Sequence, residues 1–144
     1  MNLLILHGPN LNLIGSISAR SGENITLSKI DSKLKRVASE SNINLKILQT
    51  HKVFNAINFV QRNRNWADGL LFSPLSWSKY EYSLLECLIV SDIITIEIVF
   101  SKKYSLIDNG LKSIFTAICK KTLTGDPDKV YLDGIKEIQK IINT

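Results

Sequence analysis

Short apolar runs alternate along the chain with stretches in which apolar residues recur every three or four positions. A continuous apolar run closed by turn residues is typical of a strand that is buried on both faces of a parallel sheet. The first run ends at Gly8-Pro9-Asn10, and the third ends at Ser73-Pro74. These runs predict strands at 3–6, 43–48, 69–72 and 95–100, and a shorter polar edge strand at 120–124 that ends at Gly125.

The stretches between the runs predict amphipathic helices, because apolar residues spaced three and four apart form one stripe on a helix. Thr26 can cap the first helix, which ends near 41–42, and Asp126-Pro127 opens the last one. Another helix is predicted over 78–90, whereas 106–118 has no clear pattern. The residues expected to face the core are Ile30, Leu34 and Val37; Phe54, Ile57 and Val60; Leu84, Leu85, Leu88 and Ile89; and Val130 or Tyr131, Ile135, Ile138 and Ile142.

Strands that alternate with helices on short connections predict one α/β domain over residues 1–144. The expected architecture is a flavodoxin-like, doubly wound parallel sheet of five strands in the order 2-1-3-4-5, with helices on both faces. In such sheets ligands bind outside the carboxyl ends of the strands, where the winding reverses between the first and third strands. The loops expected to carry a site are therefore 8–24, 50–54, 73–79 and 101–104.

The composition is that of an ordinary globular protein, with 44% hydrophobic and 22% charged residues. No apolar run approaches the roughly 20 residues that span a bilayer, and no signal-peptide pattern opens the chain, so a cytoplasmic location is expected. The formal net charge of +5 comes from scattered Lys and Arg, which does not favour a nucleic-acid partner. Cys87 and Cys119 form no metal-binding or disulfide pattern and are predicted to be buried thiols.

One motif points to a family. Residues 7–15 read H-G-P-N-L-N-L-I-G directly after the first predicted strand. This resembles the N-G-P-N-L-N-L-L-G signature of type II 3-dehydroquinate dehydratases (3-dehydroquinases), with His7 in place of the usual amide. The resemblance continues in register through 26–27, 48–50, 68–69, 73–74 and 96–97, and weakens toward the C-terminus.

The resemblance implies a lyase of the shikimate pathway of aromatic amino acid biosynthesis that needs no cofactor. It implies self-association as a trimer-based homododecamer. It also implies that Asn10 binds substrate and helps to polarise the reacting carbonyl or to hold a water there, with Asn12 nearby. Asn10 could instead only close an Asx turn, and Gly8, Pro9 and Gly15 are interpreted as residues that shape the loop.

In this family a proton α to the ketone of 3-dehydroquinate is removed to give an enolate. The base is a tyrosine, whose ordinary pKa of about 10 must be lowered by a cation, and the family supplies an arginine from the same loop. A histidine after the fourth strand then protonates the departing hydroxyl. Each proton-transfer group of this kind typically supplies a factor of about 10² to 10⁴ in rate.

Both proton-transfer groups are missing from this sequence. The family's loop reads G-T-R-E-P-x-x-Y-G-x-x-T-L, and residues 15–27 align with it without gaps, so Gly22 stands at the tyrosine position and Ile17 at the arginine position. Arg20 lies close enough along a mobile loop to enter the cleft. Val99 stands where the histidine is expected. The sequence therefore predicts a divergent member, a pseudoenzyme with weak or no dehydratase activity.

Other ligand positions have also changed. The family's N-H-E run falls on residues 51–53, and its N-P-G-A-Y-T-H-T-S run falls on 73–81. Ser101 matches a serine that holds the substrate carboxylate, and Lys102 replaces the next asparagine. The candidate catalytic residues are Asn10 and Arg20, the candidate substrate-binding residues are Asn12, Ser73, Lys79, Ser101 and Lys102, and no metal ligand is expected.

Three interpretations of the activity stay open. One is an enzyme with a different acid/base pair or a Schiff-base lysine, drawn from His7, His51, Lys52, Lys79, Lys102 and Tyr80. The second is a noncatalytic scaffold or binder of a small carboxylate, in which Trp66 and Trp77 serve packing. The third, a nucleotide binder, lacks any Gly-rich phosphate-binding motif. The sequence leaves open whether Arg20, Lys79 or Tyr80 enters the cleft.

Overall fold

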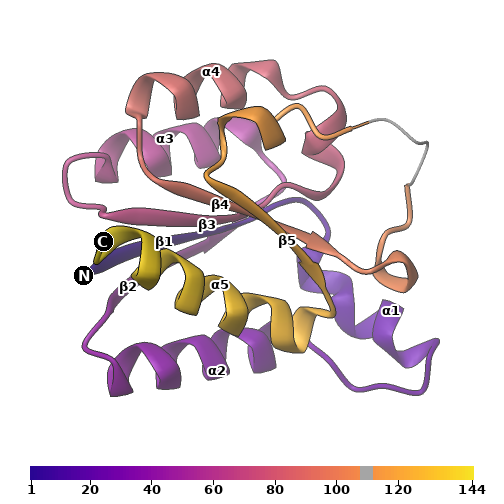
Figure 1. The fold of residues 1–144 in the computed structure, drawn as a ribbon. Coiled ribbons are helices and arrows are strands. Elements are labelled where there is room, and N and C mark those ends of the chain that lie inside the picture. Colours follow the sequence, from indigo (N-terminus) through magenta and orange to yellow (C-terminus); the bar gives the residue numbers. More distant parts are fainter. Residues whose placement is uncertain (108–111) are drawn as a thin grey trace.

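A computed structural model of the chain describes residues 1–107 and 112–144. Its centre is a parallel sheet in the order β2-β1-β3-β4-β5 (Figure 1), which confirms the predicted fold class and strand order. The strands are β1 (Asn2–His7), β2 (Asn44–Gln49), β3 (Gly69–Ser73), β4 (Thr95–Phe100) and β5 (Lys121–Gly125).

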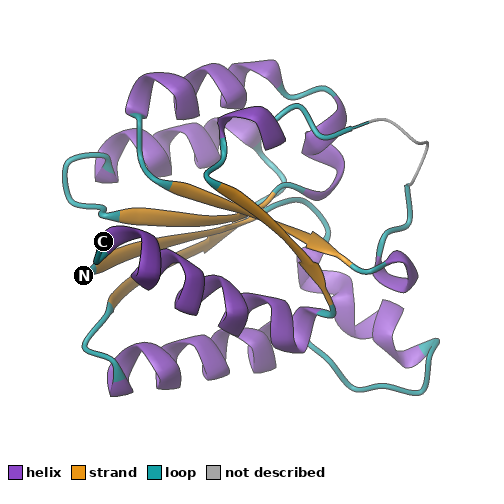
Figure 2. Cartoon of the chain, viewed as in Figure 1, coloured by secondary structure: helices purple, strands orange, loops and turns teal. Residues whose placement is uncertain are grey.

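Helices cover both faces of the sheet (Figure 1). The helices α3 (Val53–Asn63) and α4 (Tyr82–Ser91) lie on one face, and α2 (Leu27–Glu40) and α5 (Pro127–Ile142) lie on the other. The short helix α1 (Ile14–Ala19) and the loop after β4 lie at the carboxyl edge of the strands, and both termini lie at the opposite edge (Figure 2). The α1 region and the β4 loop are therefore neighbours at the predicted ligand edge.

The core consists of two apolar layers separated by the sheet. Leu3 and Ile5 of β1 join the layer beneath α2 and α5, whereas Leu4 and Leu6 join the layer beneath α3 and α4. All four side chains are fully buried. Because successive residues of a strand point to opposite faces, a strand covered on both sides needs an unbroken apolar run, as the sequence of β1 shows.

The boundaries of α2 and α5 follow the sequence signals. The hydroxyl of Thr26 accepts a hydrogen bond from the backbone N–H of Lys29 at 3.2 Å, so Thr26 caps α2 as predicted. Ile30 and Leu34 are buried, but Ala38 completes the buried stripe and Val37 is only half-buried. In α5 both alternatives of the prediction are realised, since Val130 and Tyr131 are both buried.

Some helix predictions are wrong in detail. Phe54 of α3 is 57% exposed, because Ala56 and Val60, four residues apart, face the sheet, and Phe54 lies two residues and about 200° away from Ala56 around the axis. Likewise Ile89 of α4 is 53% exposed, since the Leu84–Leu88 stripe is the buried one.

The helix predicted over 78–90 begins later, at Tyr82. A short 3-10 helix, η2 (Leu75–Lys79), precedes it. The prediction of two buried thiols holds for Cys87, whereas Cys119 is only half-buried, although desolvation raises the pKa of its thiol to about 12. In the stretch 106–118, residues 108–111 lie outside the described part, and Thr116–Ile118 form the 3-10 helix η4. Within the described residues no helix is long and apolar enough to cross a membrane.

Candidate functional site

The carboxyl ends of β1 and β3 lie against each other, as expected at the point where the winding reverses. His7 and Ser73 are register partners, and the N–H of Gly8 donates to the carbonyl oxygen of Ser73 at 2.8 Å. A Cβ atom on Gly8 would lie 2.5 Å from the carbonyl oxygen of Pro74. Gly8 is therefore required for the close approach of the two loops, which agrees with its interpretation as a residue that shapes the loop.

Asn10 lies at the surface of this edge. Its backbone is left-handed, with φ of 68°, and its N–H donates to Nδ1 of His51 at 3.2 Å. Asn10, Asn12 and His51 are all exposed. The loops after β1 and β2 thus bring Asn10 and His51 together, and two of the candidate residues meet at the predicted edge.

Beneath this surface a chain of buried polar side chains links four elements. Nε2 of His7 lies 2.9 Å from Oδ1 of Asp31 on α2, and Nδ1 lies 3.0 Å from the hydroxyl of Tyr131 on α5. That hydroxyl lies 2.6 Å from Oγ of Ser73. His7 and Ser73 are fully buried and Tyr131 is 1% exposed. Desolvation raises the pKa of Tyr131 above its ordinary value.

This polar chain changes the interpretation of two predicted site residues. Both ring nitrogens of His7 are engaged inside the protein, so His7 does not face His51 or an open cleft. The hydroxyl of Ser73 faces Tyr131 rather than solvent. Asp31 and Tyr131 were not predicted as members of this group; the polar phenol of Tyr131 within the otherwise apolar stripe of α5 was the signal that could have pointed to it.

The segment between β1 and α2 is folded rather than an open, mobile loop. It contains the 3-10 helix η1 (Leu11–Leu13) and α1, and buries Leu11 and Ile14. The buried Oγ of Ser18 accepts from the N–H of Ile25 at 2.9 Å and lies 3.1 Å from the carbonyl oxygen of the same residue. One small hydroxyl therefore joins α1 to the approach to α2.

Gly22 and Arg20 lie at the surface beyond α1. Gly22 has a φ of 72°, and no atom lies within 4 Å of the position that a Cβ would take. Arg20 is the exposed C-terminal capping residue of α1. The position where the resemblance expects a tyrosine thus has room for a side chain, but its left-handed backbone disfavours any residue other than glycine.

On β4 the carboxylate of Glu97 is fully buried and is held by hydroxyl groups. Its Oε2 accepts from Ser113 at 2.5 Å, and its Oε1 accepts from Thr116 at 2.6 Å and from Thr122 at 3.0 Å. Val99 lies two residues further along the same face of the strand. The described surroundings of Glu97 thus satisfy the carboxylate with neutral donors.

The loop after β4 carries a cluster of charged side chains. It includes the 3-10 helix η3 (Lys102–Tyr104). Nζ of Lys103 pairs with Oε1 of Glu23 and lies 3.5 Å from Oδ2 of Asp126, while the hydroxyl of Tyr104 donates to Oε2 of Glu23 at 3.0 Å. Ser101 donates to Oδ1 of Asp126, the residue before α5. The carboxylate that Ser101 contacts in this structure is therefore the side chain of Asp126 and not that of a substrate.

These contacts shift the titration of all four ionisable groups. The hydrogen bond from Lys103 lowers the pKa of Glu23, and the hydrogen bond from Ser101 lowers the pKa of Asp126. The hydrogen bond to Glu23 raises the pKa of Lys103. Desolvation, with the carboxylate of Glu23 as acceptor, raises the pKa of Tyr104. The shifts of Glu23, Asp126 and Lys103 favour the charged carboxylates and the charged ammonium, and the shift of Tyr104 favours its neutral, protonated hydroxyl.

The remaining candidates lie elsewhere along the edge. Lys102 is exposed on η3, Lys79 is half-buried at the end of η2, and Tyr80 is 58% exposed. Trp77 is 2% exposed in the core, and Trp66 is half-buried with Nζ of Lys46 at 4.3 Å from its ring centroid. Both tryptophans therefore serve packing, as predicted.

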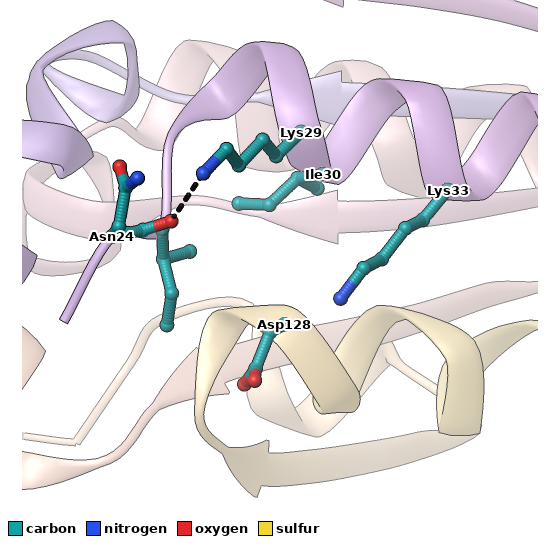
Figure 3. Close-up of a pocket in the computed structure, with 6 residues that line it drawn as sticks. Asn24, Lys29, Ile30, Lys33 and Asp128 are labelled. Atoms are coloured by element: carbon teal, nitrogen blue, oxygen red, sulfur yellow. Dashed lines mark hydrogen bonds between the residues drawn. The ribbon is translucent and has the colours of Figure 1, made fainter.

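A hollow of about 240 Å³ lies between the first turns of α2 and α5 (Figure 3). Lys29 and Lys33 reach toward it from α2 and Asp128 lines it from α5; Nζ of Lys29 donates to the carbonyl oxygen of Asn24 at 3.1 Å. None of the candidate site residues lines it. Within the described chain no group of three or more His, Cys, Asp or Glu side chains could hold a metal ion.

The chain is similar over its whole length to one family of proteins. The family model described as dehydroquinase class II matches residues 1–139. The 3-dehydroquinate dehydratase of Pelotomaculum thermopropionicum is 27% identical over 144 residues, covering 100% of both chains. That of Prochlorococcus marinus subsp. pastoris is 30% identical and covers 99% of this chain and 100% of its own.

Solved structures share the fold. A type II dehydroquinase from Butyrivibrio crossotus superposes with a TM-score of 0.84 at 22% identity, covering 96% of this chain and 97% of its own. A 3-dehydroquinate dehydratase-like protein from Bifidobacterium longum gives a TM-score of 0.63 at 12% identity, covering 99% and 96%. From the match of the family model over residues 1–139, the chain belongs to the class II dehydroquinase family.

Proposed function

We propose that this homologue of type II 3-dehydroquinate dehydratase converts 3-dehydroquinate weakly or not at all. The observation that carries the proposal is the identity of Gly22 and Val99, the residues at the positions where the family resemblance implies a tyrosine base and a histidine acid. Neither residue carries a side chain that can accept or donate a proton. Proton removal and protonation of the leaving hydroxyl would both fall to water.

The surroundings of the two positions support this proposal. The backbone at Gly22 is left-handed, and the nearby Arg20 lies exposed at the end of α1. Two residues before Val99, the carboxylate of Glu97 accepts hydrogen bonds from three hydroxyl groups of the chain itself.

Turnover measured by absorbance of the conjugated product tests the proposal. Loss of two groups worth about 10² to 10⁴ each predicts a kcat/KM roughly 10⁴-fold or more below that of an active relative. The 3-dehydroquinate dehydratase of Pelotomaculum thermopropionicum, assayed in parallel, provides the reference. A kcat/KM within tenfold of that reference would refute the proposal.

The second candidate function is the binding of small carboxylates. It is favoured by three side chains, Ser101, Lys103 and Tyr104, which all donate hydrogen bonds to carboxylate oxygens of the chain. A ligand that binds only the folded state must raise the melting temperature. We expect 3-dehydroquinate to stabilise the chain more than an unrelated carboxylate does. Equal or absent shifts would favour a scaffold without a ligand.

We further propose, from family membership, that the chain self-associates as a trimer or as a dodecamer built from trimers. Exposed apolar side chains at the end of α4, 53% for Ile89 and 79% for Val90, are consistent with a surface that a second copy covers. Light scattering of the purified chain gives the mass directly, and a monomer at micromolar concentration would contradict this proposal.

A further inference from the structure

We propose that Lys103 and Tyr104 form a binding site for a small monocarboxylate, which the chain keeps closed with its own Glu23. An external carboxylate would bind there by displacing the side chain of Glu23. We call Glu23, Lys103, Tyr104, Ser101 and Asp126 the carboxylate clasp. The inference rests on the second candidate function, a binder of small carboxylates, and names the donors and the residue that closes the site; it does not depend on whether 3-dehydroquinate is turned over.

The geometry at Glu23 is that of a bound carboxylate. One carboxylate oxygen accepts a hydrogen bond from the ammonium of Lys103, and the other accepts one from the hydroxyl of Tyr104 at 3.0 Å. Both donors come from η3, whereas Glu23 comes from the segment before α2. Charge-assisted hydrogen bonds to both oxygens are the usual means by which a protein holds a carboxylate ligand. The two donors would receive an external carboxylate in the same way.

The donors stay in place if Glu23 leaves. The side chain of Tyr104 is 2% exposed and packs in the core layer beneath α2 and α5, so its ring is fixed. Without Glu23 its hydroxyl would lose the acceptor it has here, and an unpaired buried donor costs free energy. Lys103 also keeps Asp126 at 3.5 Å. A vacated clasp therefore presents two oriented donors that favour a new acceptor.

The contact that closes the site is weak enough to be displaced. The side chains of Glu23 and Lys103 are 31% and 43% exposed, and ion pairs at such exposure contribute little to stability. Glu23 directly follows Gly22, where the position that a Cβ would take is open to a distance of 4 Å. Rotation of the Glu23 side chain, without movement of α1, would open the site.

Asp126 sets the class of ligand. It accepts from Ser101 and precedes the first turn of α5, so it remains at the site when Glu23 is displaced. The clasp then holds one ammonium and one fixed carboxylate. A monocarboxylate restores the charge that Glu23 supplied, whereas a phosphate dianion adds repulsion with Asp126. The site is therefore expected to prefer acetate-like groups to inorganic phosphate.

Titration of the full chain with acetate and with inorganic phosphate, followed by NMR, tests the proposal. Glu23→Gln removes the internal competitor while keeping its size, and we expect acetate to bind at least about fivefold more tightly than to the wild type. Glu40→Gln, at the other end of α2, makes the same charge change at an exposed position and should bind as the wild type does. Phosphate should bind more weakly than acetate.

A Glu23→Gln variant that binds acetate no more tightly than the Glu40→Gln control would overturn the proposal. So would a Glu23→Gln/Lys103→Met variant that binds as tightly as Glu23→Gln alone. If Glu23→Gln does not fold, Lys103→Met in the wild-type chain should lose the acetate shifts while Lys121→Met keeps them, and equal shifts would overturn the proposal. Turnover of 3-dehydroquinate by the wild type would contradict the proposed function without affecting this result.

Discussion

His7 occupies a position where its ring cannot reach solvent, between Asp31 on one side and Tyr131 on the other. The family resemblance implies an amide at this point, and an imidazole that is buried there requires partners for both of its nitrogens. Asp31 and Tyr131 are these partners, and the hydroxyl of Tyr131 is also hydrogen-bonded to Ser73. The imidazole at the end of β1 is thus linked by hydrogen bonds to residues from three other elements.

Tyr131→Phe is expected to lower the free energy of unfolding by about 1–3 kcal/mol. The change deprives Nδ1 of His7 and Oγ of Ser73 of their shared hydroxyl, and buried polar groups without a partner are costly. Urea unfolding monitored by circular dichroism measures the difference. Tyr82→Phe, at a side chain that is 64% exposed, should stay within about 0.5 kcal/mol of the wild type. Equal midpoints for the two variants would contradict this role of the hydroxyl.

At the scale of elements, buried or half-buried carboxylates connect segments that are distant in sequence. Glu97 on β4 joins the segment at Ser113 and Thr116 to β5 through Thr122. Glu23 joins the segment before α2 to η3. In both cases the carboxylate lies near a position, Gly22 or Val99, where the family resemblance implies a proton-transfer residue. The chain has used these carboxylates for structural contacts.

Glu97→Gln should destabilise the chain by on the order of 2 kcal/mol, because the amide nitrogen of glutamine is a donor facing hydroxyl donors, and hydrogen bonds to a charged acceptor are the stronger kind. Hydrogen exchange of 112–119 should increase together with the loss of stability. Glu86→Gln on the exposed surface of α4 serves as the control. Unchanged exchange in 112–119 would show that Glu97 does not anchor this segment.

The carboxylate clasp predicts a loss of stability in acid. The folded-state pKa values of Glu23 and Asp126 are lowered, so the unfolded chain binds protons more readily than the folded chain as the pH falls. Their contribution is fully present above the ordinary carboxyl pKa of about 4 and is lost as the pH falls through the lower folded values. Melting temperatures recorded between about pH 6 and 2 measure this loss.

Glu23→Gln/Asp126→Asn should show a shallower acid dependence than the wild type, because neither amide titrates. Glu40→Gln/Glu86→Gln removes two exposed carboxylates and should keep the wild-type slope. If both double variants follow the same curve, the lowered pKa values of the clasp do not govern the acid response.

At the scale of the whole molecule, the described surface leaves apolar side chains exposed on α4. Val90→Asp places a charge at the most exposed of the large apolar side chains, and it should reduce the mass of any assembly in light scattering, because a buried unpaired charge is costly. Leu13→Asp provides the comparison, because Leu13 lies on η1 and its side chain is as exposed as that of Ile89. Retention of the full assembly by Val90→Asp would place the interface elsewhere.

Local sequence determined most of the architecture. The unbroken runs of β1 and β3 and the termini of α2 and α5 follow from burial on two faces and from capping residues, which act over a few positions. Phe54 and the start of α4 were predicted wrongly, because the exact face of a helix depends on which side meets the sheet. That Gly22 and Val99 stand at the tyrosine and histidine positions stays a prediction from the sequence, made for Gly22 from the ungapped alignment with the family's loop and for Val99 from the alignment of Glu97.

Only the tertiary structure decided what the polar residues do. Asp31, His7, Tyr131 and Ser73 are separated by 24 to 124 positions, and no local pattern connects them. The same holds for Glu23, Lys103 and Asp126, which meet because the segment before α2, the β4 loop and the start of α5 converge at one edge of the sheet. Hydrogen bonds and ion pairs are short-ranged, so their partners are determined by the folded chain. The spacing of apolar residues, by contrast, lies within each helix or strand and can therefore be recognised in the sequence of that element alone.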